Sequence, residues 1–500
     1  MRRYFSRMVM ALMLVSFWCA AATADYKDDI GYTALANELG AGLPTGAGVK
    51  VTQVEAACGE PDPSLGEFAG KTFTIKSPNL VISGHANAVG QIFYGNSGSI
   101  APGITSIDCY SAGSWTQPGF LRYDTSTPLI SSSRVANHSW GGSDLTAGYN
   151  IAILARLDWV VDRDEYINVV GMNNGGAGVN APLLGSSFNA IAVGLSNGSA
   201  AYGSYALATT PSTPYASGSR TRPDLVAPSD YTSYATPMVS AAAALLVQEG
   251  HNGGTTLSTD PVVRSTTNRN GDTIYNAERS EVVKAALMAG ASRTSPNFSQ
   301  SYVVNTANGL NNVYGAGQLN IYNSYHVIAG GEQNSREDYL AGGGEIKGLG
   351  FDYDPAFGGA NASNKTGTYI FHTLTSGDLS ASLVWNLKVA GITGQGFDTT
   401  ATLYHLGLYL YDVSDSNRLV ASSDSSVDNT QNLWTSLNSD KIYQLVVKVD
   451  PGQLDFLWDY GLAWDITAVT THAPVPGSVY LLASGLVAIL WLKRKGVTRS

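Results

Sequence analysis

The stretch Tyr231-Thr232-Ser233-Tyr234-Ala235-Thr236-Pro237-Met238-Val239-Ser240-Ala241-Ala242-Ala243-Ala244-Leu245-Leu246 decides how the rest of the sequence is interpreted. Its alanine-rich apolar run predicts a buried helix whose small side chains allow close packing. Thr232 and Ser233 stand where that helix begins, beside unpaired backbone N–H groups and the positive end of the helix dipole. Two interpretations fit: either residue caps a core helix, or Ser233 is a nucleophile with a base beside it.

The composition is typical of an exported protein rich in strands and loops. Gly is abundant, Tyr outnumbers Phe by 27 to 13, and charged residues make up only 14% of the chain. The length of 500 residues predicts two to four structural units. The formal net charge of −10 argues against a nucleic-acid partner.

The first residues have the organisation of a secretory signal peptide. Three arginines precede the apolar run Met8–Ala21, and Ala22-Thr23-Ala24 supplies small residues for cleavage. We therefore assign residues 1–24 to a signal peptide. Two cysteines, Cys58 and Cys109, remain in the mature chain, either as a disulfide or as two free thiols.

Several upstream segments supply partners for Ser233. The run Gly48–Glu55 predicts a buried parallel strand that ends in an acid, at the sheet edge where open α/β sheets build their sites. Ser83-Gly84-His85 follows, with a helix-compatible stretch behind it. Taken singly, Glu55 fits a surface carboxylate and His85 fits a structural histidine.

The next segments alternate between strands and helices. Arg134–Gly142 predicts a strand that ends in small residues, Tyr149–Asp164 a helix, and Ile167–Gly176 a strand followed by a turn. In that turn, Asn173 either stabilises the turn itself or directs its amide into a site as a hydrogen-bond donor. Strands and helices at this short spacing predict a mostly parallel sheet with helices on both faces.

The ordered set of motifs resembles the subtilisin-like serine peptidases from about Gly46 to about Tyr325. The acid, histidine and serine appear in that family's order, and two later segments, Val283–Ala289 and Tyr314–Asn320, look like its closing helical segments. The resemblance implies peptide or protein substrates and the following site: Ser233 as nucleophile, His85 as general base and then acid, Glu55 as orienting acid, Asn173 with the Ser233 N–H as oxyanion hole, and Ser139-Trp140-Gly141 as the strand that pairs with bound peptide and borders the specificity pocket.

The sequence departs from that family in three places. The orienting acid is usually Asp, and the extra methylene of Glu55 has to be absorbed, because a misplacement near 1 Å costs on the order of 100-fold in rate. Asp62, in the loop that follows, is the alternative acid. The connection from Ala227-Pro228 to Thr232 is short, and little room precedes the first strand for the family's folding propeptide.

The second half of the chain has a different pattern. Residues Glu249–Arg279 have the composition of a surface insertion or long loop. From about Ser335, β-prone segments alternate with polar turns, which predicts an antiparallel β-sandwich. We therefore divide the chain into a peptidase domain at 25–330 and an accessory sandwich at 331–470. No cofactor is expected; Asp352, Asp354 and Asp428 are either exposed turn residues or calcium ligands.

The C-terminal end, residues 471–500, has the layout of a sorting tail. Pro474-Val475-Pro476 precedes the apolar run Val479–Leu492 and the basic cluster at 493–495, which predicts a short transmembrane helix with its basic end in the cytoplasm. This layout resembles the PEP-CTERM tails of Gram-negative exporters, although Val475 replaces the usual Glu. The resemblance implies processing by sorting machinery at the inner membrane and a cell-surface location beside exopolysaccharide. A permanent anchor is the alternative.

Two functions follow from the sequence. The first is an exported serine endopeptidase that works through an acyl-enzyme. The second is a catalytically inactive surface or matrix protein in which the sandwich binds a partner. The presence of Ser233, His85 and Asn173 together favours the peptidase.

Overall fold

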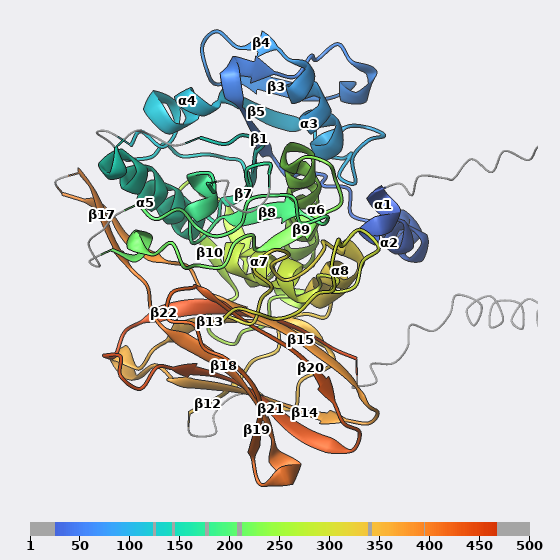
Figure 1. Ribbon diagram of the computed structural model, residues 1–500, viewed down its shortest axis with the longest axis vertical. Helices are drawn as coiled ribbons and strands as arrows, with labels where there is room; N and C mark the ends of the chain where they lie inside the picture. The colour runs from blue at the N-terminus through green and yellow to red at the C-terminus, as the bar shows by residue number, and fades with distance from the viewer. Residues whose placement is uncertain are drawn as a thin grey trace, which may run out of the picture.

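The computed structural model describes residues 26–123, 127–142, 146–175, 180–207, 213–338, 343–394 and 396–467. Within these residues, a seven-stranded parallel sheet forms the centre of the N-terminal part (Figure 1). Across the sheet the order is β3 (Thr72–Ile75), β5 (Ser106–Ser111), β1 (Val51–Glu55), β6 (Val135–His138), β7 (Ile167–Gly171), β8 (Ile191–Leu195) and β9 (Leu225–Ala227). The predicted α/β class with a parallel sheet is confirmed.

Helices cover both faces of this sheet. The long helix α6 (Thr232–Gly253) packs on one face, with α3 (Gly84–Tyr94) and α8 (Ile321–Ala329) beside it. The helix α5 (Ala147–Asp164) covers the opposite face. Both faces are therefore apolar, which explains why the central strand β1 is buried along its whole length.

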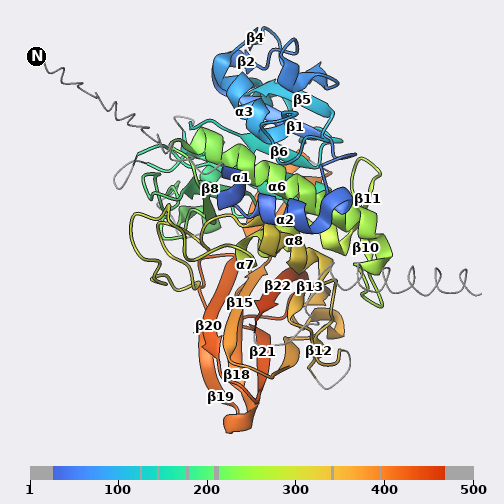
Figure 2. The same ribbon diagram turned by 90° about the vertical axis from the view of Figure 1, so that its right-hand side faces the viewer.

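The alanine-rich helix α6 packs directly against β6, β7, β8 and β9, and its small side chains allow this. Its four consecutive alanines, residues 241–244, are fully buried against the strands. Two short helices begin the described chain: α1 (Tyr26–Asp29) contacts α2 (Tyr32–Leu39), and α2 lies next to α8 (Figure 2).

The C-terminal part is the predicted antiparallel sandwich. In the described segments, one of its sheets has five strands: β12 (Arg336–Glu337), β14 (Thr366–Thr373), β21 (Lys441–Val449), β18 (Leu406–Asp412) and β19 (Arg418–Ser423). The other has four: β13 (Leu349–Phe357), β22 (Trp458–Ile466), β15 (Gly377–Val384) and β20 (Thr430–Leu437). Aromatic and aliphatic side chains fill the space between them.

The sandwich packs tightly against the N-terminal part. The helix α7 (Ser280–Ala289) contacts β15 and β22. A hairpin of β16 (Lys388–Thr393) and β17 (Gly396–Thr402) reaches back over α5 (Figure 1). Leu387 and Val389, at the base of that hairpin, belong to the same buried cluster as α5.

The region after Glu249 differs from the sequence predictions in two places. Residues 249–279 are not one long loop, because α6 continues to Gly253 and β10 (Ser265–Thr267) pairs with β11 (Thr273–Tyr275). Tyr314–Asn320 is not helical, because Gly315 and Gly317 have φ values of +57° and +128°. The helix α8 begins after it.

The structure leaves both ends of the sequence undescribed. The predicted signal peptide and the predicted transmembrane tail lie outside the described residues. Among the helices that are described, none is long and apolar enough to cross a membrane. Cys58 and Cys109 are both free; Cys58 is half-buried and Cys109 is buried.

Candidate active site

Glu55 and His85 form a hydrogen-bonded pair at the carboxyl end of the sheet. Glu55 is the last residue of β1, and His85 is the second residue of α3, whose N-terminus is capped by Ser83. His85 Nδ1 lies 2.7 Å from Oε2 of Glu55. The carboxylate is buried, whereas the imidazole keeps 41% of its surface exposed. The hydrogen bond and charge of Glu55 raise the pKa of His85, and partial burial opposes this shift.

A buried glutamine holds the second oxygen of Glu55. Gln53 Nε2 donates to Oε1 of Glu55 at 2.7 Å and to the carbonyl of Ala86 at 2.9 Å. Its own Oε1 accepts from the hydroxyl of Tyr94. Both carboxylate oxygens are therefore engaged, and Gln53 ties β1 to α3 at Ala86 and Tyr94, which both follow His85.

Ser233 is the second residue of α6, at the position predicted from the sequence. Asn174 caps this helix from another loop, because its Oδ1 accepts from the backbone N–H and the hydroxyl of Thr232, at 2.9 and 3.1 Å. Thr232 and Ser233 are thus not the N-cap. The N–H of Ser233 has no acceptor within the helix, as at any second helical position.

A proline in the second turn exposes the carbonyl of Ser233. Pro237 has no N–H to donate to the residue four positions earlier. The hydroxyl of Ser139 donates to the Ser233 carbonyl instead, at 2.9 Å, and the hydroxyl of Ser233 donates to the Ser139 carbonyl at 3.4 Å. The segment after β6 is therefore fastened to the start of α6.

The structure brings His85 to the helix turn that carries Ser233. The rings of His85 and Tyr234, the residue after Ser233, have centroids 6.2 Å apart. Within the described chain, no hydrogen bond joins His85 to the hydroxyl of Ser233, which points to Ser139. Catalytic contacts of this kind are often long in unliganded enzymes.

Asn173 lies beside Ser233, after the end of β7. Asn173 and Ser233 both line a cavity of about 50 Å³, together with Trp140 and Gly141. The amide of Asn173 donates to the carbonyl of Asn180. A Cβ on Gly141 would lie 2.3 Å from Oδ1 of Asn173, so a larger residue at position 141 would displace this amide.

Trp140 separates that cavity from a larger one. The second cavity, of about 190 Å³, is lined largely by apolar groups, including Tyr123, Trp140, Ile153 and Leu183. The indole Nε1 of Trp140 donates to Nδ1 of His138, 3.2 Å away. The predicted substrate strand therefore presents one ring to two cavities.

His138 is buried and held in one tautomer. Asn168 donates from Nδ2 to the carbonyl of Tyr166 at 2.7 Å, so its Oδ1 is left to accept from His138 Nε2 at 2.9 Å. Nδ1 then carries no proton and can accept from Trp140. Burial lowers the pKa of His138 to about 4, which keeps the ring neutral.

The alternative acid and the calcium hypothesis gain no support from the geometry. Asp62 accepts from the backbone N–H and the hydroxyl of Ser64, at 2.9 and 2.7 Å, in an exposed loop. Asp352 and Asp354 are buried in β13 and Asp428 lies before β20; each accepts hydrogen bonds from protein groups. No group of three metal-ligating side chains suited to a metal ion occurs in the part of the chain that the structure describes.

Four residues of this site were not predicted from the sequence: Gln53, Asn174, His138 and Asn168. Each is a polar residue in or just after a strand of the parallel sheet, and that is the only signal the sequence offered. Their roles depend on neighbours from other strands and helices.

Comparison with known proteins finds similarities to solved structures only. No family model and no curated protein matches the chain. An alanine mutant of the protease domain of PatA is 16% identical, covering 58% of this chain and 98% of that one, with a TM-score of 0.37. The PatG macrocyclase in complex with peptide is 14% identical, covering 59% and 94%, with a TM-score of 0.36. A protease from Pseudoalteromonas arctica is also 14% identical, covering 61% and 96%, with a TM-score of 0.35.

At such low identities and TM-scores, these similarities do not establish a shared function.

Proposed function

We propose that this chain is a serine endopeptidase that hydrolyses peptide bonds through an acyl-enzyme on Ser233. The observation that carries the proposal is the 2.7 Å contact between His85 Nδ1 and the buried carboxylate of Glu55. It fixes the imidazole with Nε2 free to accept a proton. A buried acid, a half-exposed histidine and a serine at a helix N-terminus are the parts that nucleophilic catalysis requires.

The mechanism assigns one task to each group. His85 Nε2 takes the proton of the Ser233 hydroxyl while the oxygen attacks the carbonyl carbon of the substrate. The proton then passes to the leaving amine, and water repeats the sequence on the ester. Glu55 stabilises the imidazolium that forms between these transfers.

The negative charge on the substrate oxygen is stabilised by the N–H of Ser233 and the amide of Asn173. A side-chain donor in this role contributes roughly 3–4 kcal/mol to the transition state. Asn173 has to exchange its bond to the Asn180 carbonyl for the substrate, and Ser233 its bond to Ser139. In this proposal, peptide binding completes the oxyanion hole.

The substrate class in this proposal is an extended protein or peptide. Ser139-Trp140-Gly141 offers backbone groups for pairing with a peptide, and cavities lie on both sides of Trp140. Export, processing of the C-terminal tail by inner-membrane sorting machinery and a surface location beside exopolysaccharide remain proposals from the sequence alone.

Covalent labelling tests this function directly. A fluorophosphonate probe is expected to label the wild type and not Ser233→Ala, and casein hydrolysis is expected to be lost in Ser233→Ala and strongly reduced in Glu55→Gln. A folded wild type that is neither labelled nor active would overturn the peptidase and favour the inactive binding protein. If casein hydrolysis is lost in Ser233→Ala but not reduced in Glu55→Gln, the orienting acid is a residue other than Glu55, and Asp62 is tested next.

A further inference from the structure

Residues 183–190, which we call the pocket turn, adjoin both cavities, the larger one directly and the smaller one through Met172. Leu183 lines the larger cavity. A Cβ on Gly185 would lie 2.9 Å from the sulfur of Met172, which lines the cavity beside Ser233. The chain then enters β8. A shift of this turn would therefore change both cavities.

Buried cations hold the carbonyl groups of the pocket turn. Arg222 donates to the carbonyls of Ser187 and Gly185, at 2.7 and 3.2 Å. Lys284, on α7, donates to the carbonyls of Ala190 and Phe188, at 2.8 and 3.1 Å. Arg220 donates to Ser186 and stacks on the ring of Phe188. Each of the three cationic side chains is about 1% exposed.

The carboxylate partners of these cations come from both halves of the protein. Asp224 lies 3.3 Å from Arg222 and 3.3 Å from Lys284. Asp158, on α5, accepts from the backbone N–H of Asn189 at 2.9 Å. Both carboxylates are fully buried. Together they balance two of the three positive charges.

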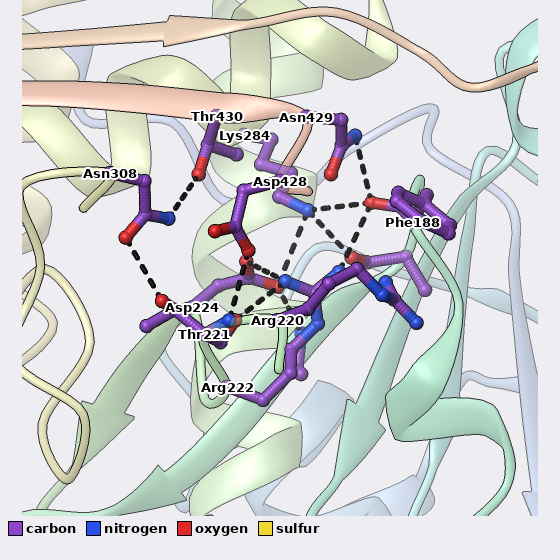
Figure 3. Close-up of polar contacts among 12 residues, drawn as sticks. Phe188, Arg220, Thr221, Arg222, Asp224, Lys284, Asn308, Asp428, Asn429 and Thr430 are labelled. Atoms are coloured by element: carbon purple, nitrogen blue, oxygen red, sulfur yellow. Dashed lines mark hydrogen bonds and ion pairs between the residues drawn. The ribbon is translucent and has the colours of Figure 1, made fainter. Parts of the chain in front are cut away.

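The sandwich supplies the third carboxylate (Figure 3). Asp428, in the loop before β20, is 3% exposed and accepts from the N–H of Thr221 at 2.9 Å, between Arg220 and Arg222 in sequence. The hydroxyl of Ser425 orients it from the sandwich side, at 2.8 Å. Burial raises the pKa of Asp428, and the charges of Arg222 and Arg220 oppose that shift. Without Asp428, one buried positive charge would lack a counter-charge, which proteins tolerate poorly.

The sandwich also bonds to the pocket turn directly. Asn429 Nδ2 donates to the carbonyl of Phe188 at 3.0 Å, as Figure 3 shows. The backbone of Leu387 pairs with the side chain of Asn189, through bonds of 2.7 and 3.2 Å. The pocket turn is therefore held by groups that lie more than 190 residues later in the chain, the backbone of Leu387 and the side chain of Asn429.

We propose that the β-sandwich is a positioning part of the substrate site, and that Asp428 and Asn429 set the pocket turn for binding an extended peptide. The proposal rests on the peptidase function above. It gives the sandwich a role in catalysis that requires no binding partner. A misplaced pocket turn weakens contacts with the peptide while Ser233, His85 and Glu55 keep their own geometry.

The test compares two reactions in the full chain. Fluorophosphonate labelling reports on Ser233 and its base, whereas cleavage of an extended peptide also requires the pocket turn. The variants are Asp428→Asn, which removes the charge, and Asn429→Ala, which removes the bond to Phe188. Ser380→Ala is the matched control, because it removes a hydrogen bond from Arg293 to the sandwich without touching the pocket turn.

We expect kcat/KM for the peptide to fall on the order of tenfold in both variants, mainly through KM, while the labelling rate stays within about twofold. Amide hydrogen exchange over residues 185–190 is expected to speed up in these variants and not in Ser380→Ala. The proposal would be overturned if Asp428→Asn and Asn429→Ala had the kcat/KM of the wild type. It would also be overturned if Ser380→Ala, at the same stability, lost as much kcat/KM as these two variants. An unlabelled wild type would instead show that the peptidase function itself is wrong.

Discussion

Gln53 and Glu55 leave β1 on the same face, and Gln53 donates to one carboxylate oxygen of Glu55 while His85 bonds to the other. The distances are 2.7 Å in both cases. An acid with one methylene more than aspartate has one more torsion to fix. The side-chain amide of Gln53 fixes this torsion, and the same amide also donates to the carbonyl of Ala86 in α3.

Replacing Gln53 by leucine should therefore disorder the acid without removing it. We expect kcat to fall between about tenfold and 100-fold, because the imidazole is held less well, with little change in KM. Steady-state kinetics on a peptide substrate measures both. Tyr94→Phe, which removes only the hydroxyl that bonds to Gln53, is the matched control and should have a smaller effect. Equal activity of Gln53→Leu and wild type would contradict this assignment.

Glu55→Asp should lower activity, although aspartate is the usual acid in the family that the sequence resembles. The shorter side chain would withdraw from His85 Nδ1, since the backbone of β1 is held between β5 and β6. A retreat of about 1 Å predicts a loss on the order of 100-fold in kcat/KM. An aspartate variant as active as the wild type would show that the site adapts to either acid.

The pH dependence should report the pair formed by His85 and Glu55. Because Glu55 raises the pKa of His85, the imidazole stays protonated to a higher pH than an unperturbed histidine, and a protonated imidazole cannot act as base. The acid limb of kcat/KM against pH is therefore expected to move to lower pH in Glu55→Gln, together with a lower maximum.

The hydrogen bond between His85 and Glu55 also makes the free energy of unfolding depend on pH, and this contribution falls as pH rises, whereas activity increases. Since the folded state raises the pKa of His85, the stabilisation by Glu55 is fully present below the unfolded pKa and is lost as pH rises through the folded one. NMR titration of His85 in Ser233→Ala measures the shift without autolysis. A titration midpoint that does not fall in Glu55→Gln would contradict the prediction.

His138→Phe should release Trp140 from its fixed orientation. Phenylalanine keeps a ring beside Trp115 but removes the acceptor of the Trp140 indole N–H. We expect KM to rise on the order of tenfold for peptides that place a large apolar side chain in the larger cavity, with kcat nearly unchanged. The indole N–H resonance of Trp140 should move toward that of free indole.

A double-mutant comparison separates this effect from general loss of packing. Trp140→Phe removes the same hydrogen bond from the other side, so His138→Phe should add little to it. Effects on KM that add fully in the double variant would show that the two residues act independently.

The fold could be predicted because its signals are local. The apolar run that forms β1 and the alanine run that forms α6 need no partner to be recognised. The order of Glu55, His85 and Ser233 could be predicted for the same reason. Tyr314–Asn320 was predicted wrongly because its conformation is set by close approach: Gly315 packs against the carbonyl of Asp224, where any Cβ would clash.

The interactions that tune the site could not be predicted, because they join residues distant in sequence. Gln53 acquires its role from Tyr94, and His138 from Asn168. The link from Asn429 to Phe188 spans 241 positions. No periodicity or motif encodes contacts of that kind.

Leu387 and Val389 lie in the same buried cluster as α5, although both follow the first strands of the sandwich. The domain boundary that we drew from the sequence at residue 331 therefore does not divide the protein into two separately packed units. A polypeptide that ended at this boundary would expose the apolar surface of α5 that Leu387 and Val389 cover, and it would be prone to aggregate. The C-terminal part alone would expose the apolar side chains that pack on α5. We therefore expect neither half to fold and work as a unit when it is expressed alone.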